Sequence, residues 1–282
     1  MILVTGATGT VGREVVRRLP ADLAVRIMAR NPQRVVGAAE TARVVHGDFS
    51  DADSLRQALS GVSIVLLVTM PYGHDDERFL RTARAAGVRR VVKLSAAAVA
   101  DSRAEDLITR RQRRNEQLLR GSGMEWTLLR PRSFMSNSLA WAPSVRSDRV
   151  VRALYGTSAN SCVDPRDVAE VAVRTLTEEG HAGRIHTLTG PEPITAVEQT
   201  AQLAGLLGRP LRFEELGPEG ARTALGGRNH PPAVVEALLE SAERQRQGAK
   251  VHVDTAVPTL LGRPAGTFRG WARDHLGAFA AL

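Results

Sequence analysis

Three glycines near the start of the chain have the spacing of a phosphate-binding turn. Gly6, Gly9 and Gly12 follow an apolar run at residues 2–4 and precede a stretch with helical apolar spacing that ends at Pro20. The first glycine permits a tight turn, the second lets backbone N–H groups approach a pyrophosphate, and the third lets the helix pack on the strand. The helix N-terminus adds partial positive charge. The motif predicts a dinucleotide site formed by Gly6, Thr8, Gly9, Thr10, Val11 and Gly12.

The end of the second expected strand, residues 24–29, bears on which dinucleotide binds. An NAD-selective site places an acidic residue here, which accepts a hydrogen bond from the ribose 2′-hydroxyl. This chain instead has Arg30, followed by Asn31 and by Arg34 one helical turn further on. A guanidinium can bind a 2′-phosphate through two hydrogen bonds. The sequence therefore predicts NADP(H) as the cofactor, with ordinary surface arginines as the alternative.

Strands and helices alternate through the first 131 residues. Apolar, strand-like runs are expected at residues 42–46, 63–68, 89–94 and 125–129, with helical stretches between them. This alternation predicts an α/β fold of the Rossmann type, a doubly wound parallel sheet that binds ligands beyond the carboxyl ends of its strands. Asp48 follows the third strand, where its carboxylate could accept from the adenine amine. An Asx turn is the alternative for Asp48.

The regular alternation of strand-like and helical stretches ends after Pro131. Residues 132–160 are irregular, with aromatic residues scattered among polar ones, which predicts an excursion into a small C-terminal substrate lobe. Asp164 and Pro165 then occupy the positions of a helix N-cap and a first helical residue, so residues 161–189 are expected to return to the core. Residues 190–260, with an amphipathic helix at 231–247, complete the lobe. We expect one domain over residues 1–282, with the Rossmann core at 1–131.

Seven stretches carry a resemblance to a known family. They are residues 4–12, 25–32, 45–49, 116–123, 126–131 with 134, 135 and 137, 163–169, and 262–273. Together they resemble the NmrA-like family of atypical short-chain dehydrogenases/reductases and are similar to its NADPH:quinone oxidoreductase and azoreductase-like members. Beyond the glycine turn and Arg30, the cofactor contacts that we expect are at Phe49, Thr69, Met70, Pro71, Ser95, Ala96, Arg132, Ser133 and Phe134. The expected substrate contacts are Tyr72, Phe134, Met135, Asn137 and Trp141.

The acid–base pair of ordinary short-chain dehydrogenases is absent. Those enzymes use Tyr-x-x-x-Lys, in which the lysine lowers the pKa of the tyrosine so that the phenol can protonate a carbonyl oxygen. The chain has two tyrosines, and the residues four positions after them are Asp76 and Ala159. Some relatives have a histidine in the same helix, where this chain has Gln112. Tyr72 and His74 are the candidate catalytic proton donors, with loop residues of no chemical role as the alternative.

Three functions are consistent with these residues. The first, which we expect, is an NADP(H)-dependent oxidoreductase that transfers hydride to a quinone-like or other conjugated small molecule. The reduced anion of such an acceptor is well stabilised and needs little acid catalysis. The second is a pathway-specific reductase of a biosynthetic intermediate. The third is a non-catalytic, NADP(H)-sensing protein that acts through a regulatory protein partner.

The composition of the chain indicates which classes of partner, such as nucleic acids, membranes and metals, are not expected. The formal net charge is +8, but the basic run at residues 110–114 has no interleaved aromatic residue, which argues against nucleic-acid binding. No apolar run approaches the ~18–20 residues of a spanning helix, so no membrane association is expected. The single cysteine, Cys162, and the scattered histidines indicate no metal site. The chain begins with a strand, which does not fit a signal peptide, so we expect a cytoplasmic protein. A homodimer is consistent with the sequence.

Overall fold

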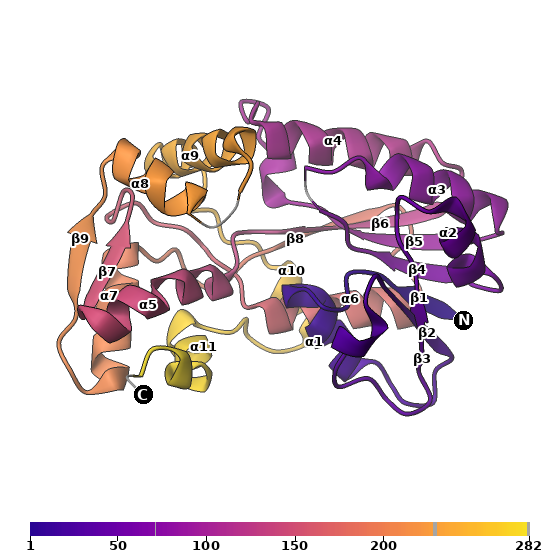
Figure 1. The fold of residues 1–282 in the computed structure, drawn as a ribbon, viewed down its shortest axis with the longest axis horizontal. Helices are drawn as coiled ribbons and strands as arrows, with labels where there is room; N and C mark the ends of the chain where they lie inside the picture. Colours follow the sequence, from indigo (N-terminus) through magenta and orange to yellow (C-terminus); the bar gives the residue numbers. More distant parts are fainter. Residues whose placement is uncertain (71, 228–229, 281–282) are drawn as a thin grey trace.

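A parallel sheet of seven strands forms the centre of the molecule (Figure 1). The computed structural model describes residues 1–70, 72–227 and 230–280. The strands lie in the order β3-β2-β1-β4-β5-β6-β8 and every neighbouring pair is parallel, which confirms the doubly wound sheet expected from the sequence. Their bounds are β1 Ile2–Val4, β2 Val25–Ala29, β3 Arg43–His46, β4 Ile64–Leu67, β5 Arg90–Leu94, β6 Glu125–Pro131 and β8 Arg184–Leu188.

Helices cover both faces of this sheet (Figure 1). On one face lie α1 (Thr10–Arg18), α6 (Pro165–Thr177) and α10 (Ala256–Leu261), and on the other α2 (Ala52–Leu59), α3 (Asp75–Ala85) and α4 (Leu107–Arg120). Val4 and Leu66 belong to the first of these two apolar layers, whereas Leu3 and Val65 belong to the second. The central strands are therefore buried on both sides, which explains their continuous apolar sequence.

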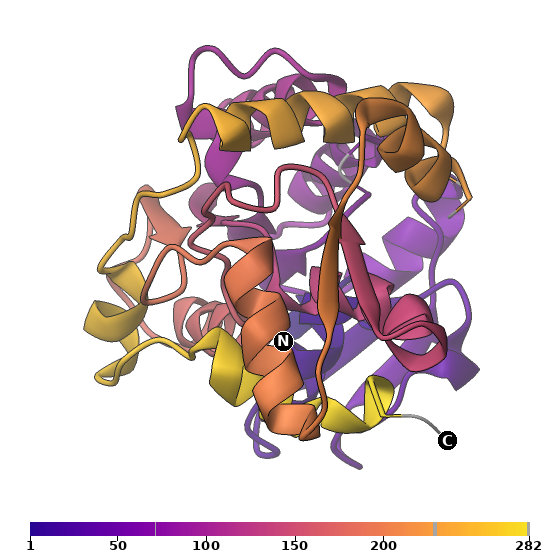
Figure 2. The same cartoon turned by 90° about the vertical axis from the view of Figure 1, so that its left-hand side faces the viewer.

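A third apolar cluster forms the lobe, which faces the viewer in Figure 2. Strands β7 (Val150–Ala153) and β9 (Arg212–Glu215) pair in parallel as a separate two-stranded sheet. The helix α9 lies across the top of this view, with α7, β7 and β9 below it. The helical elements of the lobe are η3 Met135–Trp141, α5 Ala142–Ser147, α7 Ala196–Leu207, α8 Pro218–Gly226, α9 Pro232–Arg246, α11 Phe268–Asp274 and η4 Leu276–Ala278.

The lobe departs from the expectation at residues 132–160. These residues, expected to be irregular, contain η3, α5 and β7, all too short to give a periodic sequence signal. Near the C-terminus, α11 ends at Asp274 and is followed by η4. Phe268 and Trp271 of α11 lie in the apolar cluster of the lobe, so this C-terminal segment also belongs to it.

The helix start expected at Asp164 and Pro165 is confirmed, because the Asp164 side chain caps α6 with Pro165 in its first turn. Thr195 and Glu198 form a complete capping box at the start of α7. Gly87, which follows α3, has a φ of +82°. Among the residues that the structure describes, no helix combines the length and the apolarity that crossing a bilayer would require.

The contact between α1 and the glycine turn yields a stability prediction. A Cβ atom at Gly12 would lie 2.1 Å from the carbonyl oxygen of Gly6, so we expect Gly12→Ala to lower the free energy of unfolding by about 3 kcal/mol. Gly205, inside α7, is the matched control. A Cβ there meets nothing within 4 Å, so Gly205→Ala should stabilise the protein by roughly 0.5–1 kcal/mol. Urea unfolding of both variants measures these changes; equal effects would contradict the assigned contact.

Candidate functional site

The glycine turn between β1 and α1 has the geometry of a phosphate cradle. Gly6 has a φ of +66°, and the missing Cβ of Gly12 allows the first turn of α1 to lie against it. Gly9 is the N-cap of α1; no described side chain caps the helix, and its first turn contains no acidic residue. The N–H groups of this turn therefore remain available to an anion. These features fit the pyrophosphate of a dinucleotide.

The carboxyl end of β2 presents arginines to solvent. Arg30 and Arg34 are exposed, and neither forms an ion pair with a carboxylate among the described residues. Asp48, beyond β3, accepts hydrogen bonds at Oδ1 from the amide (2.8 Å) and hydroxyl (2.7 Å) of Ser50. These two bonds hold the pKa of the Asp48 carboxyl below its usual value. Asp51 instead caps α2. The Asx turn of Asp48 is thus present, and its adenine contact stays a prediction.

A buried ion pair lies where β4 and β5 end. Lys93 Nζ of β5 is 2.5 Å from Asp76 Oδ2 of α3, and both side chains are almost completely inaccessible to solvent. Asp76 Oδ1 also accepts hydrogen bonds from Thr69 Oγ1 at 2.7 Å and from Asn115 Nδ2 of α4 at 3.0 Å. The hydroxyl of Thr69, expected to contact the cofactor, is therefore oriented by a buried carboxylate.

A second buried carboxylate orients the end of β5. Ser95 Oγ donates to Glu116 Oε1 of α4 at 2.6 Å. Arg130 of β6 binds both oxygens of the same carboxylate, with Nε 2.8 Å from Oε1 and Nη2 2.5 Å from Oε2. The hydroxyl of Ser95, expected on the cofactor side, is thus committed to an internal network.

Helix α4 carries no tyrosine or lysine. It buries Gln112, Asn115 and Glu116 instead, and the Oε1 atom of Gln112 accepts no hydrogen bond from the described residues. Asn115 donates to Asp76, and Glu116 binds Arg130. Helix α4 therefore has no phenol to donate a proton, and its one carboxylate is already bound by Arg130.

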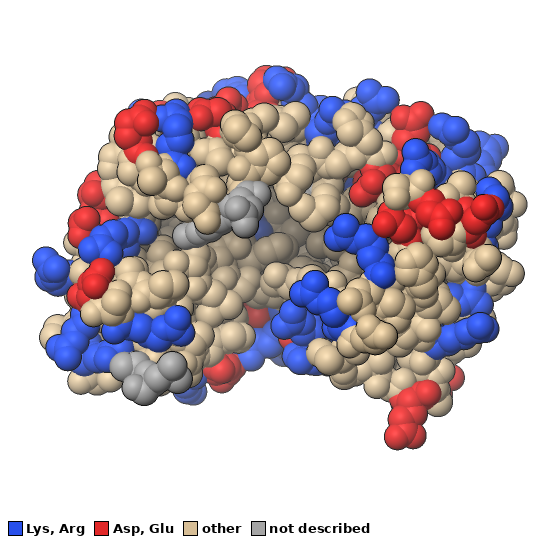
Figure 3. All heavy atoms as spheres, viewed as in Figure 1, with Lys and Arg blue, Asp and Glu red and all other residues tan. Residues whose placement is uncertain are grey.

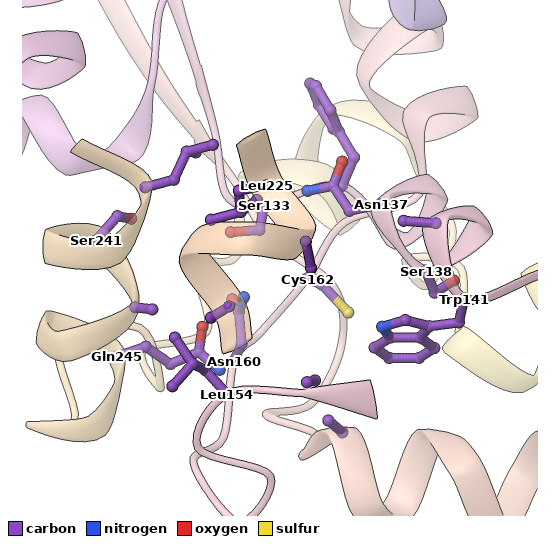
Figure 4. Close-up of a pocket in the computed structure, with 18 of the residues that line it drawn as sticks. Ser133, Asn137, Ser138, Trp141, Leu154, Asn160, Cys162, Leu225, Ser241 and Gln245 are labelled. Carbon is purple, nitrogen blue, oxygen red and sulfur yellow. Dashed lines mark hydrogen bonds between the residues drawn. The ribbon is translucent and has the colours of Figure 1, made fainter. Parts of the chain in front are cut away.

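A cavity of about 710 Å³ lies between the sheet and the lobe. Figure 3 shows this face hollowed, with basic side chains along the rim on the core side. In Figure 4, Asn137 and Trp141 of η3 lie on one side of the cavity, opposite Ser241 and Gln245 of α9. The structure brings all five expected substrate contacts into its lining, namely Tyr72, Phe134, Met135, Asn137 and Trp141. Ser133, expected beside the cofactor, lines it too.

The cavity wall is chemically divided. Helices α8 and α9 contribute an aliphatic surface, made of Ala221, Ala224, Leu225, Val234, Leu238 and Leu239. The rest of the lining is mixed: it includes the polar residues Ser133, Asn160, Gln245 and Lys250 beside apolar ones such as Ile108, Leu154 and Ile194. Burial and the neighbouring Arg244 and Arg132 lower the pKa of Lys250 to about 8, although Asp106 opposes this shift. The cavity thus offers an apolar surface and a cation within one enclosed space.

The other expected site residues lie around this cavity. His74 is exposed, lies outside the cavity lining, and has Nδ1 3.2 Å from Arg111 Nη1. Met70 is half-exposed, and Phe49 packs edge-on against Phe79. Ala96 and Arg132 are partly buried at the ends of β5 and β6. Pro71 lies outside the described residues.

Two of the groups described above were not assigned from the sequence. They are the Lys93–Asp76 pair and Lys250. A usable signal was present, because the chain has only two lysines among 38 basic residues. In a chain that uses arginine almost everywhere, a lysine marks a place where the compact ammonium group matters.

Comparisons with known proteins agree with this geometry. The family described as NAD(P)H-binding matches residues 6–179. A (4-alkanoyl-5-oxo-2,5-dihydrofuran-3-yl)methyl phosphate reductase from Streptomyces griseus subsp. griseus is 58% identical over 281 residues, covering 99% of each chain. An NAD(P)H azoreductase from Xenophilus azovorans is 34% identical over the full length of both chains.

A solved structure is also similar. It is the NADPH-dependent quinone oxidoreductase QOR2 from Escherichia coli, complexed with NADPH. It superimposes with a TM-score of 0.85 at 26% identity and covers 98% of this chain and 100% of its own. The glycine cradle, the parallel sheet and these relatives lead to one conclusion: the chain belongs to the NAD(P)H-binding family, in its NmrA-like group of atypical short-chain dehydrogenases/reductases, and is an NAD(P)H-dependent oxidoreductase.

Proposed function

We propose that this protein reduces the conjugated carbon–carbon double bond of a small phosphorylated lactone, with NADPH as cofactor. The lining of the cavity is the observation on which this proposal rests. Its aliphatic wall suits an alkyl tail, and the lysine among its polar residues suits an anionic group. The 58% identity to the Streptomyces griseus reductase supports the same class of acceptor. Among the functions consistent with the sequence, the proposal favours the pathway-specific reductase.

Such an acceptor accounts for the absence of the Tyr-x-x-x-Lys pair. NADPH supplies a hydride when it is bound. In a 4-alkanoyl-5-oxo-2,5-dihydrofuran the double bond is conjugated with both the ring carbonyl and the ketone. Reduction therefore leaves negative charge shared between two carbonyl oxygens, and water or a weak acid can protonate such an anion. The protein has to orient the acceptor more than it has to supply a strong acid.

Under this proposal, one part of the chain binds the cofactor and another binds the acceptor. Residues 1–131 and 161–189 hold the cofactor, with its pyrophosphate at the N-terminus of α1 and its 2′-phosphate at Arg30 and Arg34. Residues 132–160 and 190–260 hold the acceptor, whose alkanoyl chain lies along α8 and α9. Tyr72 is the candidate proton donor that reaches the cavity, whereas His74 lies outside its lining.

A quinone or azo compound is the second candidate acceptor. Three aromatic side chains, Tyr72, Phe134 and Trp141, line the cavity and offer flat surfaces for a conjugated ring. The azoreductase at 34% identity supports this reading. It leaves the lysine of the cavity without a role.

Steady-state turnover separates the two acceptors. We expect NADPH oxidation with a (4-alkanoyl-5-oxo-2,5-dihydrofuran-3-yl)methyl phosphate to have a higher kcat/KM than with any quinone or azo dye in a panel. Absorbance at 340 nm, with a protein-free control, measures this. A quinone that is turned over faster than the lactone would replace the proposed acceptor, and tight NADPH binding without turnover of any acceptor would refute the proposed reaction.

The choice of NADPH over NADH depends on Arg30. We expect Arg30→Ala to weaken NADPH binding about 30-fold, the loss of one charge-assisted contact, and NADH binding less than about threefold. Arg43 is the matched control, because it is also exposed but begins β3 at the amino edge of the sheet. Arg43→Ala should change neither affinity. Fluorescence titration measures both cofactors; equal losses for the two would refute the assignment.

The proposed role of Tyr72 can be tested through kcat. We expect Tyr72→Phe to lower kcat about tenfold, less than the roughly 10²–10⁴-fold typical of a general acid, because the reduced anion is already stabilised. His74→Ala should have a smaller effect, since this side chain lies outside the cavity lining. A larger loss for His74→Ala than for Tyr72→Phe would reverse the assignment.

A further inference from the structure

Lys250 lies at a fixed position in the cavity wall. Its carbonyl oxygen accepts hydrogen bonds from the amide and the hydroxyl of Ser161, at 2.9 and 3.0 Å. Its Nζ donates to Ser241 Oγ of α9 at 2.9 Å, and both side chains line the cavity. The backbone of this lysine is thus tied to the segment that leads into α6, and its ammonium group is held by one hydroxyl.

The charges around Lys250 do not balance. Arg244 forms an ion pair with Asp106 at 2.6 Å, so these two neighbours neutralise each other. Lys250 and Arg132 have no carboxylate within 4.0 Å among the described residues. Arg132 donates through Nη1 to the carbonyl oxygen of Ala249, next to Lys250, and its buried Nε finds no acceptor in the described part of the chain. Asp101 and Asp106 act on Arg132 and Lys250 only from a distance, so these two partly buried cations have no directly paired carboxylate among the described residues.

Enclosed cations without partners are unfavourable unless a ligand neutralises them. Burial and the two neighbouring arginines disfavour the charged form of Lys250, in line with its pKa of about 8. An anion bound beside Nζ would reverse this effect, because an opposite charge favours the ammonium form. The aliphatic wall does not provide such a partner, since it is made by side chains without charge.

We infer that Lys250 and Ser241 form the subsite for the phosphate monoester of the acceptor, with Arg132 adding positive charge behind it. The inference rests on the proposed function and assigns the anionic end of the substrate to a position in the cavity. A phosphate monoester provides several acceptor oxygens and close to two negative charges near neutral pH, which matches one ammonium, one hydroxyl and a nearby guanidinium. The alkanoyl chain then extends along α8 and α9.

Arg152, the arginine in the described cavity lining, is less suitable. Arg152 Nη1 lies 3.0 Å from Asp148 Oδ2, and its Nε lies 3.1 Å from Glu214 Oε2. Two carboxylates already neutralise its single charge, so a phosphate there would meet repulsion. Arg152 therefore serves as a matched variant that removes one positive charge from the same cavity.

Binding measurements without turnover test the subsite. The protein is loaded with NADP⁺, and calorimetry gives the dissociation constants of a (4-alkanoyl-5-oxo-2,5-dihydrofuran-3-yl)methyl phosphate and of the corresponding alcohol. For the wild type we expect the phosphate ester to bind about 100-fold more tightly. Lys250→Met should remove most of this preference and change the affinity for the alcohol less than about twofold, because only a charge-assisted contact is lost. Arg152→Met should keep the preference.

Ser241→Ala is the second variant, and it removes only the hydroxyl. We expect it to lower the preference about tenfold, at the lower end of the range for one hydrogen bond to a charged group. It also keeps the test valid if circular dichroism shows that Lys250→Met does not fold.

Several results would overturn the subsite. They are equal binding of the two compounds by the wild type, no binding of the phosphate ester, equal losses for both compounds in Lys250→Met, or a loss of preference in Arg152→Met. If the preference depends on Lys250 but NADPH reduces neither compound, the proposed reaction fails and the phosphate subsite stands. If both compounds are reduced equally well and bound equally well, the reaction stands and the subsite fails.

Discussion

Helix α1 can begin where it does because Gly12 lets its first turn lie against the carbonyl oxygen of Gly6. Any side chain at that position would need space already filled by backbone. The contact brings the N-terminus of α1 to the carboxyl edge of β1, and the apolar side chains of α1 and α6 share the layer that covers this face of the sheet. The ends of β2, β4 and β5 meet the same edge, so one backbone contact determines where the cofactor site is built.

Helix α4 has a different task from its counterpart in ordinary short-chain dehydrogenases. Its Asn115 and Glu116 satisfy buried groups from neighbouring elements, through Asp76 and Arg130. Such groups are costly to leave without partners, and removing one member of a buried ion pair commonly costs about 3–5 kcal/mol. The helix therefore stabilises the ends of β4, β5 and β6. In the proposed reaction the acceptor itself stabilises the anion, so no strong acid is needed from this helix.

The central strands could be predicted from the sequence because they are continuous apolar runs. The starts of α6 in the core and α7 in the lobe carry local signals, the N-cap Asp164 and the capping box of Thr195 and Glu198. Strands β7 and β9 could not be found this way, because charged residues interrupt them and each pairs with a strand far along the chain. The same reason hides Lys93 and Asp76, which parallel pairing and helix packing bring together. The part of the cavity lining at residues 134–141 could be expected from the sequence, where aromatic and amide side chains cluster, but the position of Lys250 in that lining depends on the fold.

The chain enters the lobe after β6, returns to the core for α6 and β8, enters the lobe again for α7 to α9, and returns to the core for α10 before α11 joins the lobe. The cavity is therefore assembled from two separately encoded walls, one directly joined to a core strand and the other carried by α8 and α9. Mutations in the second wall can change which alkyl groups fit without moving any residue beside the cofactor. Under the proposed function, substitutions in α8 and α9 alone would change the acceptor, whereas grafting the whole lobe onto another core would require exchanging several separate segments of the chain.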